Sequence, residues 1–246
     1  MTMNTSHPQK LYLLPLSTST IPVAPGRTLE MVSGCYLIET RDGKHILIDS
    51  GLPADYMPPV ELPPAENEKN VITHLGDLGL RPDDIDILIC THFDIDHAGY
   101  HDAFPKAELI VQREHYALAR SGHPRFAVAR AHWDHPGLQY RLIDGDTDLL
   151  PGLTLLETSG HTHGHQSVLV RLPQVGPVLL AIDAVVMQRL FTPDRQAWPT
   201  DENEAQLRAS TRKLLALVER EHVALVIFGH DGRQWQTLKK APAYYE

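Results

Sequence analysis

Short apolar runs recur along this chain, and four of them end close to a histidine or an aspartate. The first covers residues 85–90 and stops just before His92. Three later runs of similar length precede further polar residues: 153–158 before His161, 178–182 before Asp183 and 223–228 before His230. Apolar runs of about four to eight residues, bounded by glycine or polar residues, predict buried strands. We therefore expect four strands that deliver polar side chains to loops at one edge of a sheet.

Other patterns predict the scaffold around these strands. The segments 32–39 and 44–49, with an Asp42-Gly43 step between them, are typical of a β-hairpin. Apolar residues at helical spacing predict amphipathic helices over 71–78 and 207–218. The alternation of strand, loop and helix favours an α/β fold, with two stacked sheets and helices on their outer faces.

Length and composition fit a single enzyme domain. The chain has 246 residues, of which 42% are hydrophobic, so it can bury a sizeable core. We predict one domain over residues 1–246. The formal net charge is -9 and no run of Lys or Arg occurs. Binding to nucleic acid is not expected, because it needs clustered positive charge.

No segment of the sequence suits a membrane. The N-terminal apolar stretch, 11–14, is interrupted by Pro15 and is shorter than the apolar region of a signal peptide. No run approaches the roughly 20 apolar residues of a transmembrane helix. We therefore expect a cytoplasmic protein with no membrane contact.

The segment after the first apolar run is dense in potential metal ligands. His92, Asp94, Asp96 and His97 lie within six positions. Imidazole and carboxylate groups together suit zinc, iron or manganese. A solvated acidic loop before a helix is the alternative interpretation of this segment taken alone. The three similar strand ends further along the chain favour a metal site.

These residues resemble the metallo-β-lactamase superfamily, whose five motifs occur in the same order. The corresponding motifs here are Asp49 in 46–51, the segment 92–97, Gly160-His161, Asp183 and His230. The resemblance covers the chain from about Leu11 to His230, and it implies a four-layer αβ/βα sandwich. Three segments look most like the N-acyl-homoserine lactonase branch: 160–167, 181–184 and 228–231.

The resemblance also implies two divalent metal ions and a role for each polar residue. The first metal would be held by His92, Asp94 and His161, the second by Asp96, His97 and His230, and both by a bridging Asp183. A hydroxide between the metals would attack the substrate carbonyl. Asp96 would act in catalysis by passing a proton to the leaving oxygen. Asp49 would orient metal ligands through hydrogen bonds, and His165 is a further candidate for that role.

Two positions depart from the lactonase pattern. Asp94 replaces the second histidine of the H-x-H-x-D-H motif, so an anion stands where the family has a neutral ligand. Zinc is the metal that the resemblance implies, but an additional carboxylate oxygen favours iron or manganese. Val186 occupies the position of a tyrosine that contacts the substrate in lactonases. Other tyrosines are available elsewhere in the chain: Tyr100, Tyr116 and Tyr140.

A proline-rich segment follows Asp49 closely. Residues 53–64 contain several prolines, and such a composition resists regular structure. The segment either overhangs the metal site or is a simple connector. In the first case Tyr56 and Met57 would contact an acyl chain of the substrate.

Three activities are compatible with such a site. The first is opening of a lactone ring, of an N-acyl-homoserine lactone or a related small lactone, as in quorum quenching. The second is hydrolysis of a thioester or another ester, as in members like glyoxalase II. The third is di-iron oxidoreduction, because flavodiiron proteins resemble this chain in carrying a carboxylate at the position of Asp94. We predict the lactonase activity on a small-molecule substrate, in a protein able to form a homodimer.

Overall fold

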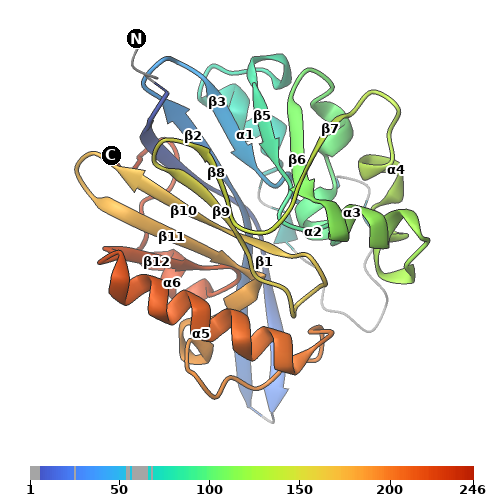
Figure 1. The fold of residues 1–246 in the computed structure, drawn as a ribbon, viewed down its shortest axis with the longest axis vertical. Coiled ribbons are helices and arrows are strands. Elements are labelled where there is room, and N and C mark those ends of the chain that lie inside the picture. The colour runs from blue at the N-terminus through green and yellow to red at the C-terminus, as the bar shows by residue number, and fades with distance from the viewer. Residues whose placement is uncertain (1–5, 25, 54–55, 57–65, 68) are drawn as a thin grey trace.

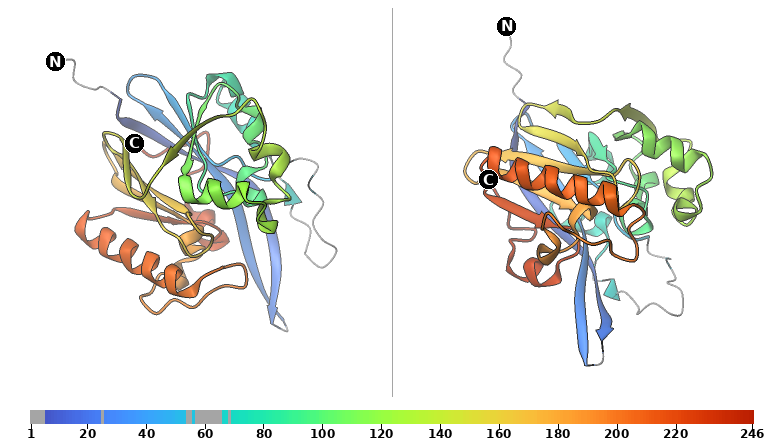
Figure 2. Two further views of the ribbon diagram at one scale, coloured as in Figure 1. Left: turned by 45° about the vertical axis from the view of Figure 1, so that its right-hand side comes forward. Right: turned by 60° about the horizontal axis from the view of Figure 1, so that its bottom comes forward.

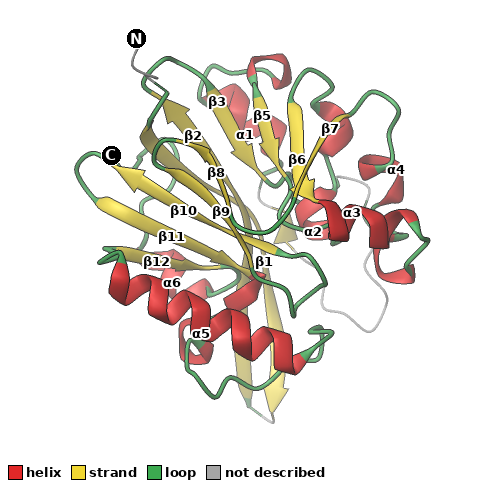
Figure 3. Cartoon of the chain, viewed as in Figure 1, coloured by secondary structure: helices red, strands yellow, loops and turns green. Residues whose placement is uncertain are grey.

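The computed structural model describes residues 6–24, 26–53, 56, 66–67 and 69–246, and these residues build two stacked β-sheets (Figures 1 and 3). The strand order in the first sheet is β4 (Glu66–Asn67), β1 (Pro8–Ala24), β2 (Arg27–Thr40), β3 (His45–Ile48), β5 (Ile87–Ile89), β6 (Glu108–Gln112) and β7 (Gln139–Ile143). The order in the second sheet is β12 (Leu225–Phe228), β11 (Gly176–Ile182), β10 (Gln166–Leu172), β9 (Leu153–Glu157) and β8 (Thr147–Leu150).

Helices lie on the outer sides of both sheets (Figure 2). Those beside the first sheet are α1 (Val71–Asp77), α2 (Ile95–Ala98), α3 (Arg113–Arg120) and α4 (Arg130–Trp133). The long α5 (Glu204–Arg220) covers the second sheet, and α6 (Gly232–Thr237) packs against β2. Short 3-10 turns complete the chain: η1 (Pro82–Asp84), η2 (His101–Ala103), η3 (Pro124–Phe126), η4 (Asp183–Val185) and η5 (Gln188–Leu190). No helix in the described ranges is both long and apolar enough to cross a bilayer.

Three groups of buried apolar residues fill the spaces between the layers. Successive residues of a strand point to opposite faces, so Leu13 of β1 packs between the sheets while Leu14 packs toward the helices of the first sheet. In the second sheet Val168 of β10 lies between the sheets, and Leu169 contacts the group that contains Leu214 of α5. Both faces of each sheet are therefore buried. This is the four-layer αβ/βα sandwich expected from the sequence, and that prediction is confirmed.

Most of the individual elements match the expectations, with differences in extent. The predicted hairpin is β2 and β3, in which Tyr36 pairs with Ile48, but β2 begins at Arg27 rather than at residue 32. The predicted helices are α1 and α5, and the four predicted strand runs are β5, β9, β11 and β12. Parallel pairing of β3 with β5 places the ends of both strands at the same edge. The metal-ligand-type residues follow at this edge.

Candidate metal centre

Loops from both sheets bring the predicted ligands together around Asp183. The Nε2 atoms of His161 and His92 lie 3.3 and 4.0 Å from Asp183 Oδ2. Those of His230 and His97 lie 3.0 and 3.6 Å from Asp183 Oδ1. These contacts form two groups of residues that could each hold a metal ion. The first is His92, His161 and Asp183, and the second is Asp96, His97 and His230. Asp183 stands between the two groups.

The two remaining carboxylates of the 92–97 segment point at these groups. Asp94 Oδ2 lies 3.4 Å from His92 Nε2 and 3.2 Å from His161 Nε2. Asp96 Oδ2 lies 3.6 Å from His97 Nε2 and 3.7 Å from His230 Nε2. All seven residues that the sequence suggested as ligands thus surround one small volume.

Unpartnered buried atoms show that the donor set suits divalent metal ions. Among the described side chains, His92 Nε2, His97 Nε2 and Asp183 Oδ1 are buried without a hydrogen-bond partner. Burying such atoms unpaired is costly, so a cation that accepts their lone pairs would explain them. Burial opposes a charged His161, but Asp183, Asp201 and Asp94 outweigh it and raise its pKa to about 9. The carboxylates therefore favour positive charge at the point where the imidazoles converge.

The ring nitrogens that face away from the centre are held by acceptors. His97 Nδ1 lies 2.8 Å from Asp49 Oδ2, and Asp49 also accepts hydrogen bonds from the backbone and hydroxyl of Thr91. His230 Nδ1 lies 2.9 Å from the Val32 carbonyl oxygen. A ring that donates from Nδ1 keeps the Nε2 lone pair for a metal. Asp49 thus occupies the place that the sequence suggested for an orienting residue.

His165 contacts the centre through the backbone of Asp183 and the ring of His92. Its Nε2 accepts a hydrogen bond of 3.3 Å from the backbone N–H of Asp183, and its Nδ1 lies 2.9 Å from Thr158 Oγ1. The ring is fully buried, and its centroid lies 5.1 Å from that of His92. Burial holds the pKa of His165 well below its usual range. The neutral imidazole fixes the backbone that carries Asp183.

The backbone around the centre adopts conformations that side chains usually avoid. Asp49 has φ of 60° and Ile182 has φ of 50°, and for a β-branched residue such a value is an outlier. Gly229 has no room for a side chain, because a Cβ atom there would lie 2.7 Å from Asp183 Oδ1 and 2.6 Å from the Ile182 carbonyl. Strain of this kind concentrates at functional sites.

Sequence analysis missed a second carboxylate that orients a ligand. Asp201 Oδ1 lies 2.8 Å from His161 Nδ1, and Asp201 Oδ2 accepts a hydrogen bond of 3.3 Å from Arg195. Both Asp201 and Arg195 have fully buried side chains. Asp201 lies in an irregular segment, with no strand before it that would have marked it in the sequence.

Arg125 was also missed, although it contacts the centre directly. Its Nε donates a 2.7 Å hydrogen bond to Asp94 Oδ1, and its second terminal nitrogen contacts Asp94 Oδ2. The same nitrogen lies 2.9 Å from His161 Nε2. Burial alone would raise the pKa of Asp94, but the Arg125 guanidinium and the neighbouring imidazoles hold it well below its usual range. The anion that replaces the expected histidine is therefore neutralised by a cation.

Of the two residues predicted to contact the substrate, Tyr56 and Met57, the structure describes one. Tyr56 is half-buried, and burial first and the charge of Asp96 second raise the pKa of its hydroxyl, so it lies within the field of the centre. Met57 lies outside the described residues. Val186 is buried, and its carbonyl accepts a hydrogen bond from the His230 backbone. Tyr140 cannot replace the missing tyrosine, because its hydroxyl donates to the Trp133 carbonyl in the core.

Comparison with known protein families agrees with this geometry. A family model described as the metallo-beta-lactamase superfamily matches residues 30–230. The chain belongs to this superfamily. The resemblance that the sequence motifs suggested is thereby confirmed.

Several relatives of this chain are named as N-acyl homoserine lactonases. An N-acyl homoserine lactonase of Bacillus sp. is 33% identical over 254 residues, which cover 96% of this chain and 98% of that protein. The N-acyl homoserine lactonase AttM of Rhizobium johnstonii is 32% identical over 244 residues, covering 89% of both chains. Relatives of this kind make the chain an enzyme, a metal-dependent hydrolase of the superfamily.

Solved structures of the superfamily superpose closely on this chain. A quorum-quenching N-acyl homoserine lactone lactonase matches with a TM-score of 0.86 at 31% identity, over 97% of this chain and 99% of that chain. An N-acyl homoserine lactone hydrolase with the product N-hexanoyl-L-homoserine at its catalytic metal centre matches with a TM-score of 0.84 at 30% identity, over 97% and 100%.

Proposed function

We propose that this protein opens the ring of N-acyl-homoserine lactones or closely related lactones by hydrolysis. The observation that carries the proposal is the convergence of seven ligand-type residues around Asp183, with unpartnered Nε2 atoms on His92 and His97. The chain covers nearly the whole length of a relative that holds the product N-hexanoyl-L-homoserine at its metal centre. No described feature favours a thioester or a redox substrate over a lactone.

The proposed ligands divide between two metal sites. His92, Asp94 and His161 hold the first metal, Asp96, His97 and His230 the second, and Asp183 both. Bound divalent cations supply Lewis acidity and a water that loses its proton near neutral pH. Asp49 and Asp201 keep the imidazoles in the tautomer that directs Nε2 inward.

Asp96 carries the proton in this proposal. Its side chain is 28% exposed, compared with 17% for Asp94 and 6% for Asp183, so Asp96 is the most accessible of these three carboxylates. Ser33 Oγ donates a 3.3 Å hydrogen bond to Asp96 Oδ2 and fixes its direction. Asp96 would accept the proton that the attacking water loses and, when the ester C–O bond breaks, pass it to the leaving alkoxide oxygen.

Arg125 takes over part of the task of the missing tyrosine. Its guanidinium borders the centre beside His161 and is 19% exposed, whereas Val186 offers no hydrogen-bond donor. A fixed N–H donor at the edge of the centre stabilises negative charge that develops on the substrate carbonyl oxygen. Arg125 also cancels the charge of Asp94, so the pair replaces a neutral histidine without adding net charge.

We propose zinc as the native metal on the basis of the family, with iron or manganese also accommodated because Asp94 contributes oxygen. Protein purified without added metal should contain close to two divalent ions per chain by elemental analysis. The zinc, manganese and iron forms are then compared on the same substrate.

The activity is tested with N-hexanoyl-homoserine lactone, whose ring opening is followed by chromatography. A thioester of the same acyl length serves as the matched alternative substrate. Hydrolysis of the lactone at least tenfold faster than the thioester supports the proposal, and the reverse order contradicts it. The single domain, the cytoplasmic location and a homodimer stay predictions.

A further inference from the structure

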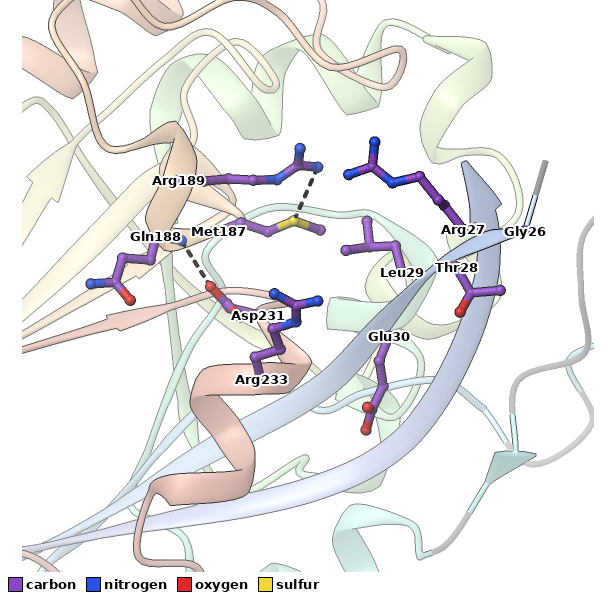
Figure 4. A pocket seen from close by; sticks show the side chains of 10 residues that line it. All are labelled: Gly26, Arg27, Thr28, Leu29, Glu30, Met187, Gln188, Arg189, Asp231 and Arg233. Atoms are coloured by element: carbon purple, nitrogen blue, oxygen red, sulfur yellow. Dashed lines mark hydrogen bonds between the residues drawn. The ribbon is translucent and has the colours of Figure 1, made fainter. Parts of the chain in front are cut away.

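A cavity with three arginines lies along the first half of β2. Its volume is about 620 Å³, and it lies between the first half of β2, η5 and the start of α6. Figure 4 shows the guanidinium groups of Arg27 and Arg189 facing each other across it, with Arg233 on a third side. The remaining lining residues include Leu29, Glu30, Met187, Gln188 and Asp231.

The arginines of this cavity differ from most others in the chain. Of the fifteen arginines in the sequence, eleven form an ion pair with a carboxylate of the described residues. The four that form none within the described part of the chain are Arg27, Arg41, Arg189 and Arg233. Three of these four line the cavity. In a protein of net charge -9, such a cluster of uncompensated guanidinium groups suits an anion.

The two acids in the lining are bound to other partners. Asp231 accepts hydrogen bonds from the backbone N–H groups of Gln188 and Gln234. Glu30 accepts hydrogen bonds from the side chain of Gln236. Neither carboxylate forms an ion pair with an arginine of the cavity in the described structure. The three guanidinium groups therefore keep donors available for a ligand.

One face of β2 connects the cavity to the metal centre. Residues at alternate positions of a strand share a face, so Arg27 and Leu29 lie on the same face as Ser33. Ser33 Oγ contacts Asp96 in the centre. At a strand rise of roughly 3.3 Å per residue, Leu29 lies about 13 Å from Ser33. Another lining residue, Asp231, directly follows the ligand His230. Met187 follows Val186, whose carbonyl accepts a hydrogen bond from the His230 backbone N–H.

We propose that the cavity binds a carboxylate at the far end of the substrate's acyl chain. The inference rests on the lactonase function proposed above and narrows it to N-acyl lactones whose acyl chain ends in a carboxylate. Leu29 and Met187 contact the aliphatic part of the chain, and Arg27, Arg189 and Arg233 bind the terminal carboxylate. A purely apolar acyl chain would offer no carboxylate to these three guanidinium groups.

The test compares two lactones with acyl chains of equal length, one ending in a methyl group and one in a carboxylate. With the zinc-loaded protein, kcat/KM should be about tenfold or more higher for the carboxylate-terminated lactone than for the methyl-terminated one, chiefly because its KM is lower. The double variant Arg27→Gln/Arg189→Gln should bring this ratio close to one. The matched control is Arg41→Gln, since Arg41 is exposed and unpaired but lies in the turn between β2 and β3; it should keep the wild-type ratio.

A binding measurement separates this inference from the lactonase proposal. Calorimetry compares a straight-chain dicarboxylate with the monocarboxylate of the same length on the zinc-loaded protein. We expect about tenfold tighter binding of the dicarboxylate, lost in the double variant and kept in Arg41→Gln. If neither lactone is opened while this preference is present, the lactonase proposal fails and the anion site stands. A wild-type ratio near one in both assays, or a ratio that the double variant keeps, overturns the anion site.

Discussion

The two halves of the metal centre are held by different chemistry. In the half that contains His97 and His230, the outward ring nitrogens lie next to Asp49 and the Val32 carbonyl, and no arginine contacts these ligands in the part of the chain that the structure describes. In the half that contains His161, two carboxylate–guanidinium pairs surround the ligands. One is Asp94 with Arg125, and the other is Asp201 with Arg195.

This difference shows how the chain accommodates an anion in place of a histidine. A buried or half-buried carboxylate is stable only when an opposite charge or several donors compensate it. In the half that contains His161, each additional carboxylate is accompanied by its own arginine, and both arginines lie outside the strands and α-helices. The unusual ligand and the arginine beside it therefore form one unit, and changing one without the other should be more harmful than changing both.

The largest effect is expected from Asp183→Asn, which breaks both halves at once. Asp183 lies between the two groups of ligands, so the loss of its negative charge weakens the binding of both metal ions. We expect a loss of lactone hydrolysis on the order of 10³-fold or more, together with loss of metal. Elemental analysis and kcat/KM are measured on the same sample. Asp83→Asn, an exposed aspartate paired with Lys106, is the control. Full metal content and activity in Asp183→Asn would exclude the bridging role.

Arg125→Gln tests the half that departs from the family. It removes a donor at the edge of the centre and leaves Asp94 without its cation, and losing one such donor costs about 10²–10³-fold in rate. The expected fall in kcat/KM is of that order. The Asp94→His single variant should also lose activity, because it removes the carboxylate that offsets the guanidinium charge next to a metal. The other ion-pair partner of Arg125, Glu202, lies 3.6 Å away at the opposite terminal nitrogen.

The double variant Asp94→His/Arg125→Gln decides whether the two residues act as one unit. It restores the neutral ligand that the family has and removes the cation that faces Asp94. We expect it to regain metal in the half that contains His161 and to be more active than Asp94→His alone. Such a result would show coupling between the two positions in a double-mutant cycle. Metal stoichiometry is the readout that does not depend on turnover. Strictly additive effects would show that Asp94 and Arg125 contribute independently.

Substituting the two orienting carboxylates one at a time should affect the two halves separately. The expected loss of metal affinity is smaller than the effects above. Asp49→Asn removes the acceptor of His97, and Asp201→Asn removes that of His161. Loss of such a partner typically lowers metal affinity about 10–100-fold. Titration with a chelator should therefore remove one metal early from each variant, and a different one in each. Simultaneous loss of both metals in both variants would mean that the halves cannot be separated.

The smallest effect concerns His115, which ties the two ligand loops together. Its Nε2 accepts a 2.8 Å hydrogen bond from the Phe93 backbone, and its Nδ1 lies 2.7 Å from the His163 carbonyl. Burial lowers its pKa from 6.5 to about 4. Between these values the unfolded chain binds the proton and the folded chain does not, so stability falls as the pH drops through this range.

The size of this pH effect can be measured. His115 should contribute about 2 kcal/mol of lost stability between pH 7 and pH 5, and nothing further above pH 7. Urea unfolding at both pH values gives the difference for the wild type and for His115→Gln, which cannot take up a proton. Equal pH dependence in the two proteins would show that His115 is not responsible.

The sequence predicted the ligands better than it predicted their surroundings. His92, His161, Asp183 and His230 each follow an apolar run, and strand ends at one edge must converge, so local pattern and fold together placed them. Arg125 lies 31 positions from Asp94, outside any strand, and no periodicity marks it. Its position depends on how the segment between α3 and α4 folds over the centre, which is a property of the tertiary structure.

The fold shows the same limit. Buried runs such as β11 and amphipathic α5 were identified, because their side-chain patterns are set by the layers that they face. The long β1 was not, since Pro15 and Pro22 interrupt its apolar pattern. Irregularities in the pairing with β2 occur near both prolines, which explains how a strand can contain them.

The left-handed backbone at Ile182 limits how this enzyme can be made more resistant to heat. A β-branched residue at φ of 50° costs roughly 1–3 kcal/mol, which glycine would relieve. The following residue is Asp183, whose direction depends on that turn. Ile182 is also fully buried in the core between the sheets, and deleting such a side chain costs about 2–5 kcal/mol. Ile182→Gly should therefore lower Tm although it relaxes the turn, so that heat tolerance cannot be gained by removing the strain at this position.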